Sequence, residues 1–219
     1  MINVDSRSQK LESVTIGKYP FYFLFDKNSP NGSSGHYFKH PYNRKIGVKV
    51  FADTKLTKEQ DARNLYLRAQ GAHEDIVWEA ALINCFYKKR VAVVRFCIDT
   101  STQDKYLGIV MPHFSGKHPQ NMLGTFYCSR KDKCYLRSGR GRVPLATAIN
   151  MRAFEIGFHL SDLHEQNVIV DSNGRPWPID FGSHSIQAFK NFGGLAKEYS
   201  WAMENFKKHY HQTVKGKVY

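Results

Sequence analysis

Short apolar runs separated by turn residues fill most of the first half of the chain. The runs are rich in aromatic and β-branched residues, and the stretch between the first two runs is dominated by Gly, Asn, Ser and Pro. This pattern is typical of β-strands joined by turns. It predicts strands at residues 21–25, 36–38, 46–51, 91–98 and 106–111.

Apolar residues recur at helical spacing elsewhere. Residues 54–89 are mostly helical in pattern, with Gly71 separating a second helix at 73–89, and a further helix is predicted at 144–160. A last amphipathic helix is marked by Leu195, Tyr199, Met203, Phe206 and Tyr210. Residues 1–19 show little periodicity, so we expect a loose lead-in there. Separate predicted strands and helices of this kind fit an α+β fold.

Composition and charge narrow the class of protein. With 219 residues, 42% of them hydrophobic, the chain can bury a core as one domain or as two closely packed lobes. A net charge of +13 favours acidic partners such as nucleotide phosphates, nucleic acid or an acidic protein surface, although it also serves solubility. The four cysteines show no metal-binding spacing and fit a reducing compartment. Without a signal-peptide or membrane-span pattern, we expect a soluble, intracellular working site.

The stretch 157–182 carries the strongest candidate chemistry. Asp162 precedes Asn167 by five positions, an apolar run and a turn follow, and a second short run ends at Asp180. A hairpin of this kind places three oxygen-bearing side chains at one end. Mg²⁺ prefers oxygen ligands, which suits Asn167 and Asp180, and leaves Asp162 to orient a hydroxyl. The alternative is a surface hairpin whose Asp and Asn serve only as turn residues.

A lysine and a glutamate form a second candidate pair. Strand alternation places Lys49 with Gly47 and Phe51 on one face of the strand 46–51, and Ile46, Val48 and Val50 on the other. Glu79 interrupts the apolar stripe of the helix 73–89, and a buried carboxylate needs a partner. We expect Lys49 to be that partner and favour Glu79 over Glu74, because an acid at a helix start usually compensates the helix dipole.

The sequence D-x-x-x-x-N from Asp162 to Asn167, followed by Asp180-Phe181-Gly182, resembles the catalytic and metal-binding loops of the protein-kinase-like superfamily. Asp162-Leu163-His164 is also similar to aminoglycoside and choline phosphotransferases, which share that fold. The resemblance implies that Asp162 accepts a hydroxyl proton, that Asn167 and Asp180 bind Mg²⁺, and that Lys49, held by Glu79, neutralises the phosphates of ATP. Leu160 stands where the family usually has His.

The same resemblance extends to a nucleotide site. The loop Gly32-Ser33-Ser34-Gly35 matches the second half of the family's glycine-rich loop, with Pro30 in place of its first glycine, although a plain hairpin turn is the alternative. The break at 112–116 resembles the hinge, where Met111 and His113 are expected to meet adenine. The implied organisation is a β-rich small lobe at 20–111, then a hinge and a truncated helical large lobe at 112–219.

In its short length and its lack of an A-P-E motif, the sequence resembles the small effector kinases that bacteria deliver by type III secretion. This resemblance implies an ATP- and Mg²⁺-dependent protein Ser/Thr kinase, a virulence factor acting on a host protein in the host cytoplasm. One such family is reported to phosphorylate the eukaryotic ninety-kilodalton heat-shock chaperone. A small-molecule phosphotransferase and an inactive kinase-like binding module are the alternatives. We expect a monomer, with no nucleic-acid partner and no membrane span; the basic cluster at 130–142 is either a solvated face or a surface for an acidic partner.

Overall fold

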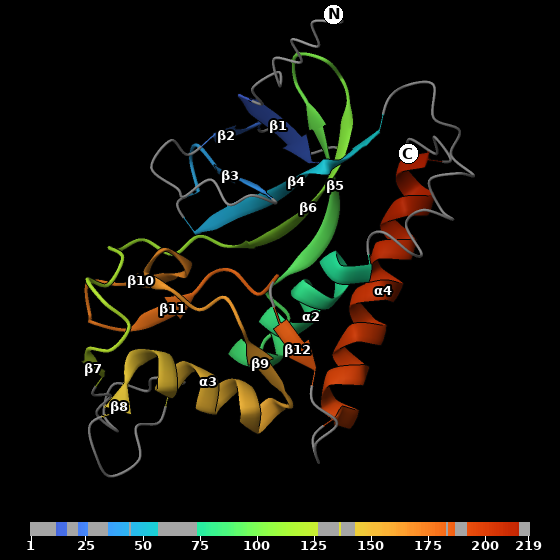
Figure 1. The fold of residues 1–219 in the computed structure, drawn as a ribbon. Coiled ribbons are helices and arrows are strands. Elements are labelled where there is room, and N and C mark those ends of the chain that lie inside the picture. The colour runs from blue at the N-terminus through green and yellow to red at the C-terminus, as the bar shows by residue number, and fades with distance from the viewer. Residues whose placement is uncertain are drawn as a thin grey trace, which may run out of the picture.

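The chain folds as a mixed α/β structure with a curled antiparallel sheet and few helices. The computed structural model describes residues 12–16, 22–25, 35–43, 45–56, 74–126, 136, 143–182, 184–186 and 192–214. Figure 1 shows the sheet at the top, two helices beside it, and a third helix with short hairpins below.

The described strands of the curled sheet form a closed antiparallel barrel in the order β1-β2-β3-β4-β6-β5 (Figure 1). They are β1 (Ser13–Ile16), β2 (Tyr22–Phe25), β3 (His36–Lys39), β4 (Ile46–Leu56), β5 (Val93–Asp99) and β6 (Lys105–Pro112). The five predicted strands are present. β1 was not expected, because it lies in the stretch taken as a loose lead-in. It closes the barrel by pairing with β2 and β5, and its alternation buries Val14 and Ile16 inside.

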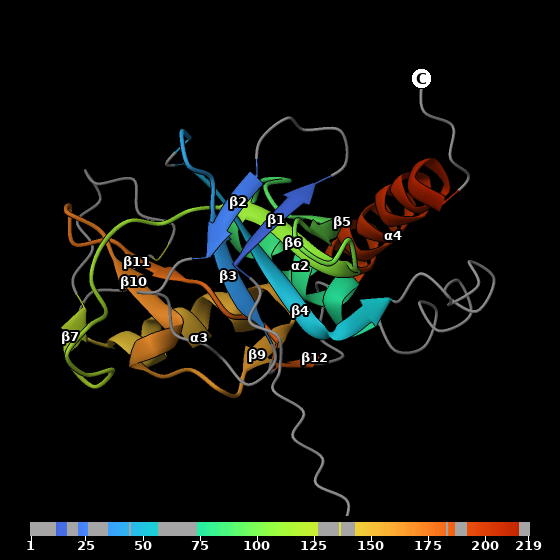
Figure 2. The ribbon, with the colours of Figure 1, turned by 90° about the horizontal axis from the view of Figure 1, so that it is seen from above.

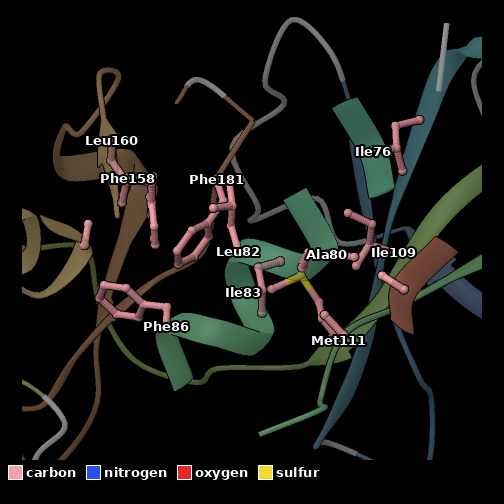
Figure 3. Packing of buried hydrophobic residues seen from close by; sticks show 14 of the residues in the cluster. Ile76, Ala80, Leu82, Ile83, Phe86, Ile109, Met111, Phe158, Leu160 and Phe181 are labelled. Carbon is pink, nitrogen blue, oxygen red and sulfur yellow. The ribbon is translucent and has the colours of Figure 1, made fainter. Parts of the chain in front are cut away.

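The two faces of the barrel wall have different roles. One apolar cluster consists of Val14, Ile16, Phe38, Val48, Val50, Cys97 and Tyr106, which fill the interior. Alternation along β4 turns Lys49 to the outer face, as the sequence predicted. On that outer face lies α2 (Glu74–Tyr87), whose apolar residues join Ile109 and Met111 in the main core (Figure 3).

Two predicted helices have different boundaries in the structure. Residues 54–56 were expected to begin a helix but belong to β4, where Thr54 donates to Phe51 O (2.6 Å) and accepts from Leu107 N (2.7 Å) across an irregular register. The rest of that expected helix, 57–73, lies outside the described residues. The predicted helix 144–160 is shorter: α3 spans Leu145–Ile156 and ends at Gly157, whose φ of 105° is left-handed. Glycine adopts this conformation without steric cost, which is why it terminates helices.

Short antiparallel pairs flank α3. β7 (Thr125–Phe126) pairs with β8 (Val143–Pro144) before it, and β9 (Phe158–Leu160) pairs with β12 (His184–Ile186) after it. Between β7 and β8 runs the basic cluster predicted at 130–142. Of its residues the structure describes Leu136 alone, which is buried in the main core.

The final helix, α4 (Phe192–Val214), makes its main contacts with α2 and β5 (Figure 1, Figure 2). The resemblance placed this segment with α3 in the helical large lobe at 112–219. Instead, Ala202 and Phe206 of α4 are buried, and the Phe206 ring lies 6.1 Å from that of Phe96 on β5. None of the described helices is long and apolar enough to cross a membrane.

Candidate active site

Three charged side chains from distant elements meet at one point. The Lys49 Nζ on β4 lies 2.9 Å from Glu79 Oε1 on α2 and 2.9 Å from Asp180 Oδ1, which follows β11 (Pro176–Pro178). Lys49 is 8% exposed and Glu79 is 1% exposed. The predicted Lys49–Glu79 ion pair is therefore present. Glu74, the competing acid, is exposed at the start of α2 and accepts a hydrogen bond from Tyr199.

The charges of Lys49, Glu79 and Asp180 keep Lys49 protonated and favour a further cation beside the three side chains. Burial alone lowers the pKa of Lys49, but the carboxylates of Glu79 and Asp180 outweigh it and raise that pKa above its usual value. Burial raises the pKa of Glu79, and Lys49 only partly opposes this effect. Burial also acts to raise the pKa of Asp180, but Lys49 reverses the shift and lowers it. When both carboxylates are ionised, one ammonium faces two of them and the three side chains together carry a net negative charge.

The triplet Asp180-Phe181-Gly182 is fixed by contacts on both sides. Phe181 is fully buried, with its ring 5.3 Å from that of Phe86 on α2 (Figure 3). The Phe181 N–H donates to Glu79 Oε1 (3.3 Å), and the Gly182 N–H donates to Asp180 Oδ1 (3.0 Å). These bonds aim the Asp180 carboxylate at Lys49 while the aromatic ring anchors the loop in the core.

The predicted hairpin brings the second candidate ligand close. β10 (Val168–Val170) pairs with β11, and Asp171 holds the turn by accepting hydrogen bonds from Asn173 N, Arg175 N and Trp177 Nε1. At the open end, Ile179 N donates to Asn167 O (3.0 Å), which places Asn167 beside the approach to Asp180.

Asn167 and Asp162 are linked through the backbone. Asn167, 9% exposed, donates from its Nδ2 to the Asp162 carbonyl oxygen (2.8 Å). This bond fixes the amide orientation and leaves Oδ1 as the acceptor end. The Asp162 side chain is 64% exposed, as suits a group that meets an incoming acceptor.

His164 is a site residue that sequence reasoning did not single out. Its Nδ1 accepts from Gln166 N–H (3.2 Å), so in the neutral ring the proton is on Nε2, which lies 3.8 Å from Asp162 Oδ1. Its position in the motif Asp162-Leu163-His164 was the only available signal.

The donor set fits Mg²⁺. Asn167 and Asp180 offer an amide oxygen and a carboxylate, and the triad around Lys49 has an excess of negative charge. The described residues contain no group of three or more His, Cys, Asp or Glu side chains that could hold a metal. Two protein oxygens are sufficient for Mg²⁺ where substrate phosphates complete its shell.

Leu160, two positions before Asp162, has an imidazole opposite it on another strand. Leu160 is buried in β9, and its backbone N and O are both bonded to the Asn150 side chain (3.0 and 3.3 Å). Opposite it on β12, His184 donates from Nδ1 to Phe181 O (2.9 Å). An imidazole therefore reaches the Asp180-Phe181-Gly182 loop from after the triplet, where no sequence pattern indicated it.

The expected nucleotide-contacting residues are only partly described. Gly32, Ser33 and Ser34 lie outside the described residues. Gly35 packs on the Lys49 stem, since a Cβ there would be 3.2 Å from Lys49 Cγ and Cε. Met111 is 3% exposed and lies in the main core, so its side chain faces α2. Binding roles for these residues and for His113 stay predictions.

An aromatic contact unforeseen from the sequence lies beside Lys49. Tyr37, opposite Lys49 in the β3–β4 register, crosses Gly47 and places its hydroxyl 3.0 Å from His113 Nδ1. The two rings stack with centroids 5.7 Å apart. A Cβ on Gly47 would lie 1.8 Å from the Tyr37 hydroxyl, so glycine is needed for the tyrosine to lie there.

Gly47→Ala is expected to destabilise the fold by about 1–3 kcal/mol, because the added methyl overpacks against Tyr37. In a Tyr37→Ala background the same change should cost far less, since the ring is gone. Urea unfolding of the two single variants and the double variant measures the coupling. An equal cost in both backgrounds would contradict the placement of Tyr37 over Gly47.

Comparisons with known proteins find no matching family model and no matching curated protein. Among solved structures, the chain is similar to a high-resolution crystal structure of WbdD, with 16% identity, a TM-score of 0.40, and coverage of 88% of this chain and 40% of that chain. A co-crystal structure of WbdD and the kinase inhibitor LY294002 gives 17% identity, a TM-score of 0.41, and coverage of 89% and 40%. This chain thus spans 40% of the length of the WbdD chains.

Proposed function

We propose that the chain is an ATP- and Mg²⁺-dependent phosphotransferase with a protein-kinase-like fold, acting as a protein Ser/Thr kinase. The observation that carries this proposal is the placement of Lys49 Nζ at 2.9 Å from both Glu79 and Asp180. Lys49 and Asp180 are 131 positions apart in the sequence, and a lysine held by a glutamate beside an aspartate is the combination that phosphoryl transfer uses.

The proposed arrangement has two lobes. The barrel and α2 form the small lobe, while the β10–β11 hairpin, α3 and the β9–β12 pair form the reduced large lobe. The connection after β6 supports this division, because Lys117 pairs with Val170 of the hairpin through N–H to O bonds of 3.0 and 2.7 Å. Lys49 and Asp180 then face each other across the lobe boundary.

Each residue of the site has a definite task in this proposal. The Lys49 ammonium neutralises phosphate charge, and Glu79 keeps it in position. Asn167 and Asp180 bind Mg²⁺, which when bound supplies further charge neutralisation to the phosphates. Asp162 orients the acceptor hydroxyl and accepts its proton. Catalysis consists of positioning and electrostatic stabilisation.

A protein acceptor is favoured by exposure and charge. The Asp162 carboxylate is largely exposed, so an acceptor hydroxyl on a macromolecule can approach it. The net charge of +13 suits an acidic protein. By resemblance, we propose a host protein as substrate, with the ninety-kilodalton chaperone as the first candidate, and the host cytoplasm as the working site after secretion. A small-molecule phosphotransferase is the second candidate, favoured by His164 beside Asp162.

The test is transfer of radiolabelled phosphate from ATP in the presence of Mg²⁺. Wild type should label a protein in eukaryotic lysate or the purified chaperone, while Asp162→Asn should not. Asp75→Asn, an exposed carboxylate of α2, is the matched control and should label as wild type does. Label in an aminoglycoside or amine panel would instead favour the second candidate. Absence of nucleotide turnover with every acceptor and with water would overturn the proposal.

A further inference from the structure

The outer surface of α2 is covered by α4 through an aromatic stack. The Trp78 ring of α2 lies 3.9 Å from the Tyr199 ring of α4, centroid to centroid, at an interplanar angle of 23°. The Tyr199 hydroxyl donates to Glu74 Oε1 at the start of α2 (3.1 Å). One α4 side chain therefore contacts two residues of α2 that are four positions apart and lie on the same face of its first two turns.

A second contact fixes the far end of α2. Arg90, three residues beyond the helix, forms two hydrogen bonds to the Glu198 carboxylate (3.1 and 3.3 Å). Its guanidinium carbon also lies 4.6 Å from the centre of the Trp201 ring. A bidentate pair reinforced by a cation–π contact restricts orientation more than a single exposed ion pair does.

α4 can act as a support because it is fixed to the barrel as well. Phe206 and His209 lie against Phe96 of β5, at centroid distances of 6.1 and 6.2 Å. Leu195 and Ala202 are buried along the same helix. Figure 2 shows α4 lying along α2 and β5. α2 is thus enclosed between α4 on one side and the β4 face that carries Lys49 on the other.

Glu79 directly follows Trp78, so the stack and the ion pair belong to the same helical turn. A small rotation or shift of α2 away from α4 would move the Glu79 carboxylate beyond hydrogen-bonding distance of Lys49, since the present 2.9 Å has little margin. The same shift would remove the Glu79 acceptor from Phe181 N–H.

We infer that α4 is a positioning element for the active site: its Tyr199 and Glu198 hold α2, through Trp78 and Arg90, in the place where Glu79 binds Lys49. The helix α4 of the same chain then assembles the site. Its catalytic consequence rests on the proposed function, but the Lys49–Glu79 contact can be measured independently of any activity.

The experiment compares Tyr199→Ala combined with Glu198→Ala against wild type. Lys49 is acylated with an amine-reactive ester and quantified by mass spectrometry, at a temperature where all variants are folded. Loss of the Glu79 contact should free the Lys49 side chain from one of its two ion-pair partners and raise its acylation rate several-fold. ATP turnover, kcat/KM, should fall by a similar factor. Tyr199→Phe keeps the ring stack and should keep Lys49 protected.

Val14→Ala is the matched control, because Val14 is buried in the separate barrel-interior cluster. It should lower the unfolding temperature while leaving Lys49 acylation unchanged. If the double variant is poorly folded, the ion pair is reversed instead, with Arg90→Glu and Glu198→Arg. Each single substitution should raise Lys49 acylation, and the two together should restore protection. If Val14→Ala raises Lys49 acylation as much as α4 variants of the same thermal stability do, the inference is overturned. Absence of ATP turnover in wild type contradicts the proposed function, while Lys49 acylation still decides the role of α4.

Discussion

Asp180→Asn is expected to reduce Mg²⁺-dependent ATP turnover about a thousandfold, the scale of losing a preorganised charge at the reacting centre. The change removes the carboxylate proposed to bind the metal, which is also one partner of Lys49. The fold should persist, because Lys49 and Glu79 remain as a neutral pair and the Asn oxygen can still accept from Gly182 N–H. Turnover of radiolabelled ATP and thermal unfolding measure the two effects.

Asp171→Asn is the matched control, with the same substitution in the same hairpin. Asp171 accepts three hydrogen bonds that hold the turn, so this variant should lose stability and keep most of its turnover. Near wild-type turnover by Asp180→Asn would refute the metal assignment. A larger stability loss in Asp180→Asn than in Asp171→Asn would show that Asp180 is chiefly structural.

The centre of the site could be predicted because local rules determine it. Period-two alternation placed Lys49 on the outer face of its strand, and a carboxylate within an apolar helical stripe required a cationic partner. The hairpin between Asn167 and Asp180 was equally readable, since its turn residues lie between two short apolar runs. In both cases the prediction depends only on residues that are close together in the sequence.

The parts that were missed depend on long-range packing. β1 (SVTI) lacks the aromatic run that marked β2, and its partners lie on two other strands. Leu160 continued the helical spacing of α3, but Gly157 ends the helix before it. An amphipathic pattern shows that α4 has an apolar face and cannot show which surface that face covers. His184 reaches the site only through the β9–β12 pairing.

Lys49→Met is expected to destabilise the fold by about 3–5 kcal/mol, the usual cost of leaving a buried charge without its partner. Glu79, at 1% exposure, would then face Asp180 with no cation between them. ATP turnover should be lost as well, since no ammonium remains to meet the phosphates. Urea unfolding measures the stability, provided that the m-value is unchanged.

The double variant Lys49→Met with Glu79→Gln isolates the buried charge. Gln keeps an oxygen for Phe181 N–H but carries no charge, so most of the lost stability should return while turnover stays absent.

The stability of Lys49→Met should also depend on pH, in a direction set by Glu79. The pKa of Glu79 is already raised by burial, and removal of Lys49 raises it further. A group with a raised folded pKa stabilises the fold below its unfolded pKa, about 4.3 for Glu, and loses this contribution as pH rises through the folded value. Lys49→Met should therefore lose stability from acidic to neutral pH relative to the double variant, and parallel curves for the two would contradict a charged Glu79 as the cause.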